Sequence, residues 1–470
     1  MGVSNGSDVA GRNPVGVDFS IYSEASVYSA TSVDRIPTSQ LPLKWRHAAI
    51  SIGNFDGVHR GHQRLIQRLR NVSRRLAAPA MAIAVTFDPP PGVFLSHGAI
   101  SAPLTTLSRK VALLRQAGAD VVWVLKTTPE LLALSPETFF QRILLDQLQT
   151  QAVVEGSDFR FGVQRTGTVE TLQSLCKAQN ISLHIVSPLL LTDFKTTSYD
   201  SSTSNSNSSS LRVESNVCVL SNGDENSDLG VESGFDVPLR PFHVETRGTL
   251  LPSVGRRPDP RQDTASISCG SGVDGVSEGV AVSSSRIRRQ IRAGEIANAA
   301  WLLGRYHELS GIVVHGEHRG RTLGYPTANL AQIPELLPPD GVYAGRVTLP
   351  GTEDTVASQY TENTEDPSTR STYSAAVAIG PNTTFDGTER KCEIHLLNFH
   401  GDLYGKPLRL ELVAKIREMR RFETVTELLA QMAEDVQATT KAVDGAADSA
   451  IGGAVNSGAV NGGEISPTVR

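Results

Sequence analysis

The sequence predicts an α/β protein with two ordered parts, an open parallel sheet and then a small antiparallel barrel with a C-terminal helix. Apolar strand-like runs alternate with amphipathic helical stretches between about residues 47 and 188. Short strand-like runs then follow one another between about residues 309 and 413, with no helix expected until about 423. Between the two parts, Ser, Asn, Asp, Gly and Thr dominate and aliphatic residues show no period.

These composition changes predict the domain boundaries. A length of 470 residues allows two or three domains with sizeable cores. We expect an α/β domain and a barrel domain, with an insertion within the first and a disordered tail at each end. The predicted segments are a tail at 1–45, an α/β domain at 46–190 with 282–304, an insertion at 191–281, a barrel domain at 305–437 and a tail at 438–470. Because loop-closure entropy grows slowly with length, the insertion need not disable the domain around it.

The elements of the α/β domain can be placed in order. Gly118 stands where a helix should stop, and Ser135-Pro136 is a typical helix start. Parallel strands joined by right-handed crossovers bind ligands beyond their carboxyl ends. Strands are expected at about 47–53, 80–87, 121–125, 151–155 and 182–186, and helices at about 61–77, 108–117, 136–148 and 168–179.

The turn from the first strand into the first helix reads G-N-F-D-G-V-H-R-G-H at 53–62. Its glycines allow a tight turn and close approach of a ligand, and a helix N-terminus favours phosphate. His59 and His62 lie three residues apart and can both donate to phosphate oxygens. An H-x-x-H pair by itself more often only packs or titrates, but the whole pattern at a strand-to-helix turn is far more specific.

Two further segments follow strand ends that we expect at the same edge of the sheet. They read T-F-D-P-P-P at 86–91 and G-S-D-F-R-F-G at 156–162. Alone, the first is a proline-rich turn and the second a glycine-bounded loop. After the insertion, V-S-S-S-R-I-R at 282–288 opens a helix expected to run through Trp301 to Gly304. Hydroxyls and guanidinium groups at a helix start can bind phosphate, although a serine-capped basic helix is an equally good interpretation.

Together these segments resemble the nucleotidyltransferase superfamily, and in particular the adenylyltransferase half of the bacterial bifunctional riboflavin kinase/FMN adenylyltransferase (FAD synthetase) family. The resemblance implies a Rossmann-like domain in which His59 and His62 contact the phosphates of ATP and stabilise the leaving pyrophosphate. Pro90 stands where the family usually has a histidine, in F-x-P-H-P. The nucleotide- and flavin-binding residues implied here are Gly53, Asn54, Phe55, Asp56, Asp158, Arg165, Ser284 and Arg288.

The predicted barrel carries G-Y-P-T-A-N at 324–329 and K-C-E-I-H-L-L at 391–397. Gly316 to Thr322 faintly resembles a P-loop, but it is one residue short, has Arg321 in place of lysine and lacks the following helix. Thr424 and Glu427 form a capping box that starts the final amphipathic helix. Barrel strands are expected at about 311–316, 342–349, 373–380, 391–398 and 408–413.

These motifs resemble the riboflavin kinase domain. The resemblance implies that Thr327 and Asn329 hold Mg²⁺ against the phosphates of ATP, and oxygen ligands of this kind suit a hard cation. It also makes Glu393 the base that activates the ribityl 5′-hydroxyl of riboflavin. Further substrate contacts are expected at Gly316, Gly320, Gly324 and Arg421. The expected substrates are thus ATP, riboflavin and FMN, with Mg²⁺ as cofactor.

Composition limits partners and location. A net charge of −5 argues against a general nucleic-acid surface. The sequence shows no apolar run of transmembrane length and no signal peptide, so we expect a cytoplasmic protein without a membrane partner. The oligomeric state stays open. Four cysteines without paired or metal-like spacing indicate a reducing compartment: Cys176, Cys218, Cys269 and Cys392.

Two alternatives compete with a bifunctional enzyme. In the first, Pro90 and the long insertion have disabled adenylyl transfer and only the kinase works. In the second, the chain is a flavin-binding regulator without turnover. The intact pair His59 and His62 and the intact Glu393 favour the bifunctional interpretation, because binding alone needs no base.

Overall fold

The computed structural model describes residues 19–22, 45–76, 78, 80–95, 102–191, 279–316, 319–349, 371–381 and 390–452. The chain divides into two compact units, one of 1–189 with 282–443 and one of 190–281 with 444–470. The predicted barrel domain and the predicted α/β domain, except for Leu190, lie in the first unit.

The α/β domain contains a six-stranded sheet in the order β1-β4-β3-β2-β5-β6. Five strands are parallel, which confirms the predicted open sheet, and β1 pairs antiparallel with β4 at one edge. The prediction of a disordered tail at 1–45 was wrong for β1, because its F-S-I-Y alternation is too short to show a period; of the rest of that tail, only Trp45 lies within the described residues. The strands are β1 Phe19–Tyr22, β2 Ala49–Ile52, β3 Ala82–Asp88, β4 Val121–Lys126, β5 Ala152–Gly156 and β6 Ser182–Val186.

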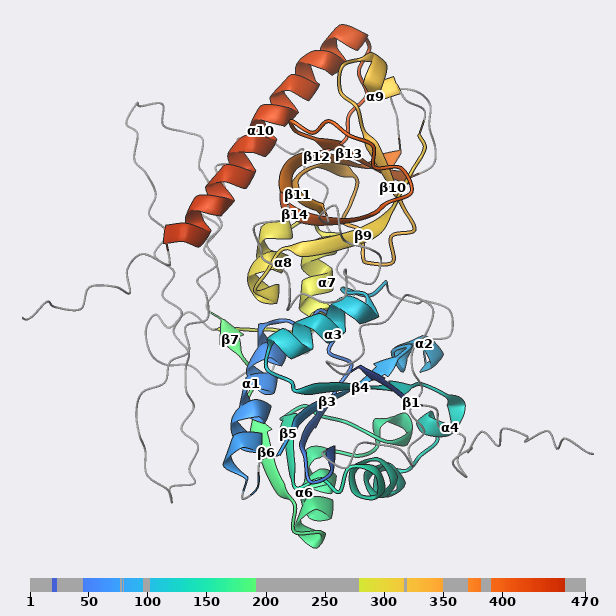
Figure 1. Ribbon diagram of the computed structural model, residues 1–470, viewed down its shortest axis with the longest axis vertical. Helices are drawn as coiled ribbons and strands as arrows, with labels where there is room; N and C mark the ends of the chain where they lie inside the picture. Colours follow the sequence, from blue (N-terminus) through green and yellow to red (C-terminus); the bar gives the residue numbers. More distant parts are fainter. Residues whose placement is uncertain are drawn as a thin grey trace, which may run out of the picture. The chain divides into compact units, whose positions relative to one another are not determined.

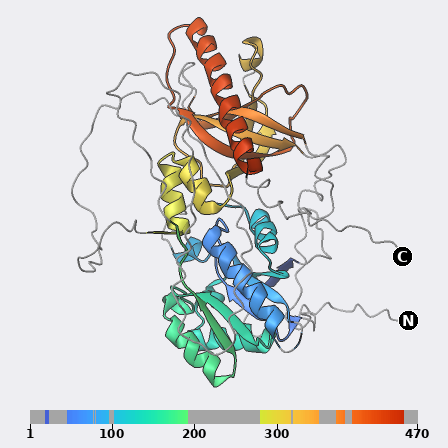
Figure 2. The same ribbon diagram turned by 90° about the vertical axis from the view of Figure 1, so that its left-hand side faces the viewer.

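Helices cover both faces of this sheet (Figure 1). One face packs against α1 (Arg60–Arg75) and α3 (Leu107–Gln116), and Figure 2 views the domain from the side of α1. The other face packs against α6 (Val169–Ala178) and α5 (Pro136–Phe139), with α5 continuing as a π-helix over Phe140–Gln147. The helical stretch predicted at about 136–148 is therefore confirmed, and its π-helical part turns three large apolar residues into the core. These are Phe140, Ile143 and Leu144.

Smaller elements complete the domain. Short helices α2 (Gly92–Leu95) and α4 (Pro129–Leu132) follow β3 and β4. At the insertion, β7 (Leu190–Leu191) pairs antiparallel with β8 (Val280–Ala281). These two strands lie at the ends of the predicted insertion, and residues 192–278 lie outside the described part.

The helix predicted from 284 to Gly304 is two helices, α7 (Ser284–Arg292) and α8 (Ile296–Leu303). The prediction was wrong between them because Gly294, at φ +78°, leaves the helical region. Gly304 ends α8 in the left-handed conformation at φ +77°, as its position predicted.

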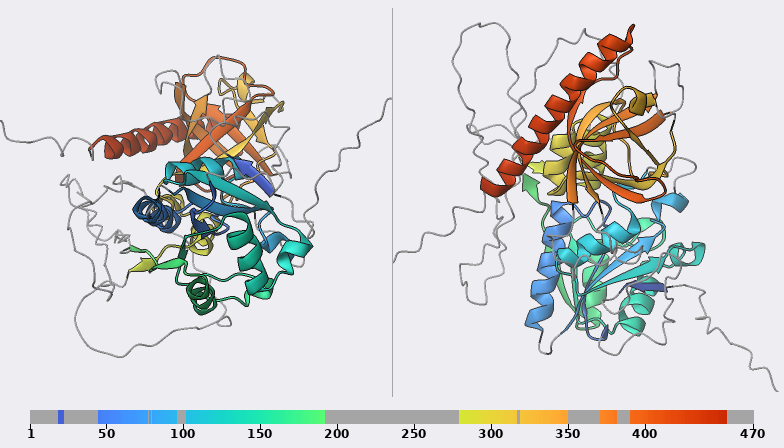
Figure 3. Two further views of the ribbon diagram at one scale, coloured as in Figure 1. Left: turned by 60° about the horizontal axis from the view of Figure 1, so that its bottom comes forward. Right: turned by 45° about the horizontal axis from the view of Figure 1, so that its top comes forward.

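The second domain is a closed antiparallel barrel in the order β10-β13-β12-β11-β14-β9, and Figure 3 shows its ring of strands. Apolar side chains alternate inward along each strand and form the barrel core. A single helical turn, α9 (Arg319–Thr322), contradicts the prediction of no helix before 423. The strands are β9 His307–Val314, β10 Ala328–Ala331, β11 Gly341–Leu349, β12 Ser371–Pro381, β13 Arg390–Leu396 and β14 Pro407–Arg417.

The last helix, α10 (Val425–Gly452), begins at the predicted capping box. The hydroxyl of Thr424 accepts the backbone N–H of Glu427 at 3.2 Å, and the Glu427 carboxylate accepts the N–H of Glu423 at 3.3 Å. The helix continues to 452, so the disordered tail predicted from 438 was wrong over 438–452. Alanine-rich sequence is a good helix former and was mistaken for low complexity.

Two composition-based expectations can be compared with the described residues. Cys176 and Cys392 lie in that part of the chain, and both are buried free thiols. Within the ranges given above, no helix has the length and apolar character needed to span a membrane.

Candidate active sites

The motif at 53–62 forms a strained turn between β2 and α1. Phe55 and Val58 have positive φ values of 46° and 37° although neither is glycine. A Cβ on Gly53 would lie 3.1 Å from the Phe55 ring, so glycine lets this ring fold back under the strand end. The Phe55 ring is buried and meets the His62 ring edge-on at 5.3 Å. Phe55 therefore supports His62 from the core, while Asn54 lies exposed at the tip of the turn.

His59 and His62 form a stacked pair at the start of α1, with ring centroids 3.6 Å apart. His59 caps the helix, and its Nδ1 accepts the backbone N–H of His62 at 3.3 Å, which leaves the proton on Nε2. Burial and then the charge of Arg305 lower the pKa of His59 to about 4. Burial and then the charges of His59, Lys110 and Arg305 lower the pKa of His62 well below its usual range. Both rings are thus neutral hydrogen-bonding groups at pH 7.

The segment after the insertion lies against this motif. Ser284 Oγ donates to the backbone carbonyl of Asp56 at 2.9 Å, and Arg288 forms an ion pair with the Asp56 carboxylate. The other carboxylate oxygen of Asp56 accepts the N–H of Leu104 at 2.9 Å. Ser283 rather than Ser284 caps α7, by accepting the N–H of Arg286. The structure therefore brings Ser284 and Arg288 to the histidine motif across 232 sequence positions.

Two cations near the histidines were missed by sequence reasoning. Lys110 on α3 is only 4 % exposed; burial lowers its pKa, and the nearby carboxylates of Asp56 and Asp88 oppose this. Burial likewise lowers the pKa of Arg305 to about 10, and its guanidinium donates to the carbonyl of Val58 at 3.4 Å. Neither residue lies in a recognisable motif. They supply the positive charge that two neutral imidazoles lack.

A buried carboxyl, Glu155, lies where the strand order reverses, between the parallel strands β2 and β5. The β2–β5 ladder pairs Ala49 and Ile50 with Ala152 and Val153, and Glu155 Oε1 accepts the N–H of Ile52 at 2.6 Å beyond it. Burial raises the pKa of Glu155 well above its usual range. Sequence reasoning missed Glu155 because it lies inside an apolar strand. The predicted contacts Asp158 and Arg165 are exposed on the following loop.

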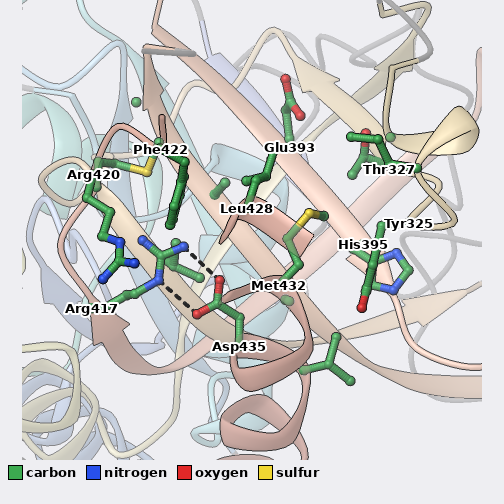
Figure 4. Close-up of a pocket in the computed structure, with 18 of the residues that line it drawn as sticks. Tyr325, Thr327, Glu393, His395, Arg417, Arg420, Phe422, Leu428, Met432 and Asp435 are labelled. Carbon is green, nitrogen blue, oxygen red and sulfur yellow. Dashed lines mark hydrogen bonds and ion pairs between the residues drawn. The ribbon is translucent and has the colours of Figure 1, made fainter. Parts of the chain in front are cut away.

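In the barrel, the pairing of β10 with β13 places Asn329 directly opposite Glu393. Cys392 and Ile394 point into the barrel core, so Glu393 lies on the outer face. Directly opposite residues on paired strands have neighbouring side chains on the same face. Thr327, just before β10, lines an outer pocket together with Glu393 (Figure 4).

Glycines allow the backbone to approach these side chains closely. A Cβ on Gly316 would lie 2.1 Å from Asn329 Nδ2, and one on Gly320 would lie 2.3 Å from the Tyr325 carbonyl and 3.3 Å from Thr327 Oγ1. Gly324, at φ +85°, occupies a conformation that favours glycine. All three glycines thus shape the predicted metal-binding segment.

The rest of the pocket is lined by apolar side chains from the barrel and from α10. Val342, Ala376 and Ala378 come from β11 and β12, and Leu428 and Met432 come from α10.

An ion pair holds α10 beside the barrel, because Arg417 binds both carboxylate oxygens of Asp435 at 2.8 and 2.7 Å. Arg417, Arg420 and Phe422 line this end of the pocket, and both guanidinium groups lie over the Phe422 ring (Figure 4). The predicted contact Arg421 is exposed and is not among the lining residues.

The donor set fits a hard cation. Thr327, Asn329 and Glu393 offer a hydroxyl, an amide and a carboxylate oxygen on one face, and Mg²⁺ prefers oxygen ligands. His395 Nδ1 lies 2.8 Å from the carbonyl of Pro326, and its ring meets Tyr325 edge-on. This contact fixes the segment that carries Thr327.

Comparison with known proteins gives the same division of the chain. Residues 41–200 match the family model described as FAD synthetase, and residues 303–443 match the one described as riboflavin kinase. The chain is 28 % identical over 392 residues to the bifunctional riboflavin kinase/FMN adenylyltransferase of Escherichia coli K12, covering 82 % of this chain and 90 % of that protein. It is also 28 % identical over 393 residues to the protein of that name from Pseudomonas fluorescens, covering 84 % and 92 %.

A solved structure shares the fold. A crystal structure of a macrolide-efflux protein from Streptococcus pneumoniae matches with a TM-score of 0.56 and 22 % identity, covering 86 % of this chain and 96 % of that one. At this identity the likeness concerns the fold alone.

Proposed function

The chain belongs to the bifunctional riboflavin kinase/FMN adenylyltransferase family, and we propose that it carries out both reactions of that name. The barrel transfers a phosphoryl group from ATP to riboflavin, giving FMN. The α/β domain joins FMN to the adenylyl group of a second ATP, giving FAD and pyrophosphate. The observation that carries the proposal is that residues far apart in the sequence lie close together in both sites. Thr327 and Glu393 line one pocket, and Ser284 and Arg288 contact the histidine motif.

In the kinase site, Glu393 acts as the base. Its carboxylate removes the proton of the ribityl 5′-hydroxyl as that oxygen attacks the γ-phosphorus of ATP, whose bond to the bridging oxygen breaks so that ADP leaves. Thr327 and Asn329 would hold Mg²⁺, which when bound offsets the charge of the ATP phosphates. The apolar lining of Val342, Ala376 and Ala378, with Leu428 and Met432 of α10, suits the aromatic ring of the flavin and excludes water from it.

In the adenylyltransferase site, an oxygen of the FMN phosphate attacks the α-phosphorus of ATP and pyrophosphate leaves. His59 and His62 are neutral, so they donate hydrogen bonds to phosphate oxygens without adding charge. Lys110 and Arg288 provide the positive charge that stabilises the transition state and the leaving pyrophosphate. Asp158 and Arg165 serve as flavin or nucleotide contacts from the loop after β5.

Both activities are tested by one chromatographic time course. Purified protein is incubated with riboflavin, ATP and Mg²⁺, and in a second series with FMN in place of riboflavin. We expect FMN to form first and FAD to follow, and FMN supplied directly to be converted to FAD.

The same assay tests the competing functions. FMN that accumulates without conversion would favour a kinase with an inactive α/β domain, for which Pro90 and the long insertion are the supporting observations. No product from either substrate would favour a flavin-binding regulator.

A further inference from the structure

Asp56 contacts two separate stretches of the α/β domain. Its Oδ1 accepts the N–H of Leu104 at 2.9 Å, at the approach to α3. Its Oδ2 forms the ion pair with Arg288, and its backbone carbonyl accepts the hydroxyl of Ser284 at 2.9 Å. The neighbouring Gly57 N–H adds a bond to the hydroxyl of Thr105 at 3.3 Å. This turn of the motif is thus the meeting point of α1, α3 and α7.

These contacts are well shielded. The side chain of Asp56 is 13 % exposed and that of Arg288 is 19 % exposed. An ion pair at this depth is screened less by solvent and salt than one on the surface, so it can fix the position of a guanidinium group. Both carboxylate oxygens are already engaged, and a carboxylate would repel a triphosphate if it faced one directly.

We propose that Asp56 is a positioning residue, which acts through Arg288 and Ser284 by holding the start of α7 against the histidine motif. The inference rests on the proposed adenylyl transfer and deepens it, because it gives Asp56 a role other than direct contact with ATP. It explains how a site can work although its segments lie 228 and 232 positions apart in the sequence. Asp56 orders the segment, and Ser284 and Arg288 then meet the phosphates.

The first test compares Asp56→Asn with Arg288→Met and with the double variant, in the full chain. Asparagine keeps an oxygen for Leu104 but presents an uncharged amide to Arg288. We expect FAD formation to fall on the order of 100-fold in either single variant, the loss typical of a misplaced catalytic group. In the Arg288→Met background, Asp56→Asn should then cause little further loss, because residues that act as one unit are not additive.

A matched control is Asp340→Asn in the barrel, which removes the carboxylate of an Asp–Arg pair with Arg390 at 2.7 Å. This pair is 40 % and 46 % exposed, and its loss should leave FAD formation from FMN unchanged. In every variant, the rate of riboflavin phosphorylation reports whether the protein has folded.

Hydrogen exchange supplies a readout independent of turnover. In Asp56→Asn, the amides of 286–292 should exchange faster while those of the barrel strands do not change. Equal losses of FAD formation in the wild-type and Arg288→Met backgrounds, or wild-type activity in Asp56→Asn, would overturn the inference. If the unmodified protein forms no FAD, the proposed function fails, and unchanged exchange in 286–292 would then overturn the positioning role separately.

Discussion

The two sites are assembled in different ways. The proposed adenylyltransferase site joins segments separated by more than 200 positions, and its His59 and Lys110 are buried. The kinase site is built on paired strands of one barrel, where backbone register alone sets Asn329 opposite Glu393. Side-chain ion pairs and hydrogen bonds therefore determine the first site, and backbone pairing determines the second. Single substitutions should reveal this difference.

The largest effect is expected from Glu393→Gln. The amide keeps the size of the side chain but cannot accept the proton of the ribityl hydroxyl, so phosphorylation of riboflavin should fall by roughly 10²- to 10⁴-fold. Conversion of supplied FMN to FAD should not change, because the base belongs to the barrel alone. Steady-state rates with each substrate check both statements. Unchanged riboflavin phosphorylation would remove Glu393 as the base.

The next largest effect is expected from His62→Asn, in the adenylyltransferase site. Asparagine has a shorter side chain, so its amide cannot donate a hydrogen bond from the position of the imidazole. FAD formation should therefore fall by roughly 10²- to 10³-fold, the range seen when one donor to a developing charge is removed. Riboflavin phosphorylation serves as the internal control. A variant that loses both activities together would mean that the two domains depend on each other for folding, and would contradict the separation drawn above.

A buried histidine of each domain should also respond to pH. The pKa of His59 and that of His307 in β9 are both lowered to about 4, mainly by burial. In the unfolded chain these histidines bind a proton near pH 6.5, whereas in the folded protein they resist protonation until about pH 4. The contribution of each neutral histidine to the free energy of unfolding is therefore fully present above pH 6.5 and is lost as the pH falls toward 4. The shift of His59 corresponds to roughly 3 kcal/mol. Denaturant unfolding of His59→Asn should show a weaker pH dependence between 4 and 6.5; an unchanged slope would contradict a buried neutral His59.

Lys110→Met should have a moderate effect confined to ATP in the adenylyltransferase site. The substitution keeps the apolar stem in α3 but removes the ammonium beside His62, so we expect the KM for ATP in FAD formation to rise about tenfold, equivalent to about 1.4 kcal/mol. The KM for ATP in the kinase reaction should be unchanged. Arg115→Met, in the last turn of the same helix, is the matched control. An equal effect of both variants would indicate a change in the helix rather than in the site.

Much of this organisation was predictable from the sequence. Strand–helix alternation located all five parallel strands, and the P-T-A-N and E-x-H-L segments proved to be neighbours in one barrel. Lys110 and Glu155 could not be predicted, because each interrupts an apolar pattern and becomes distinctive only through its surroundings in space. The break at Gly294 was missed because one glycine inside a helical pattern does not by itself end a helix, and the length of α10 was missed because its alanine-rich sequence was mistaken for low complexity.

The smallest effect is expected from removing most of the insertion. Residues 190–191 and 280–281 already pair as β7 and β8, so a short turn can replace 192–278 and still deliver Ser284 to Asp56. Shortening a loop changes its closure entropy only slowly, and Asp56 rather than the loop holds α7 in place. Both activities should therefore stay within about twofold of the full chain, as measured by the same time course. Loss of FAD formation alone would show that the first site needs the insertion, and would place part of its assembly in residues 192–278.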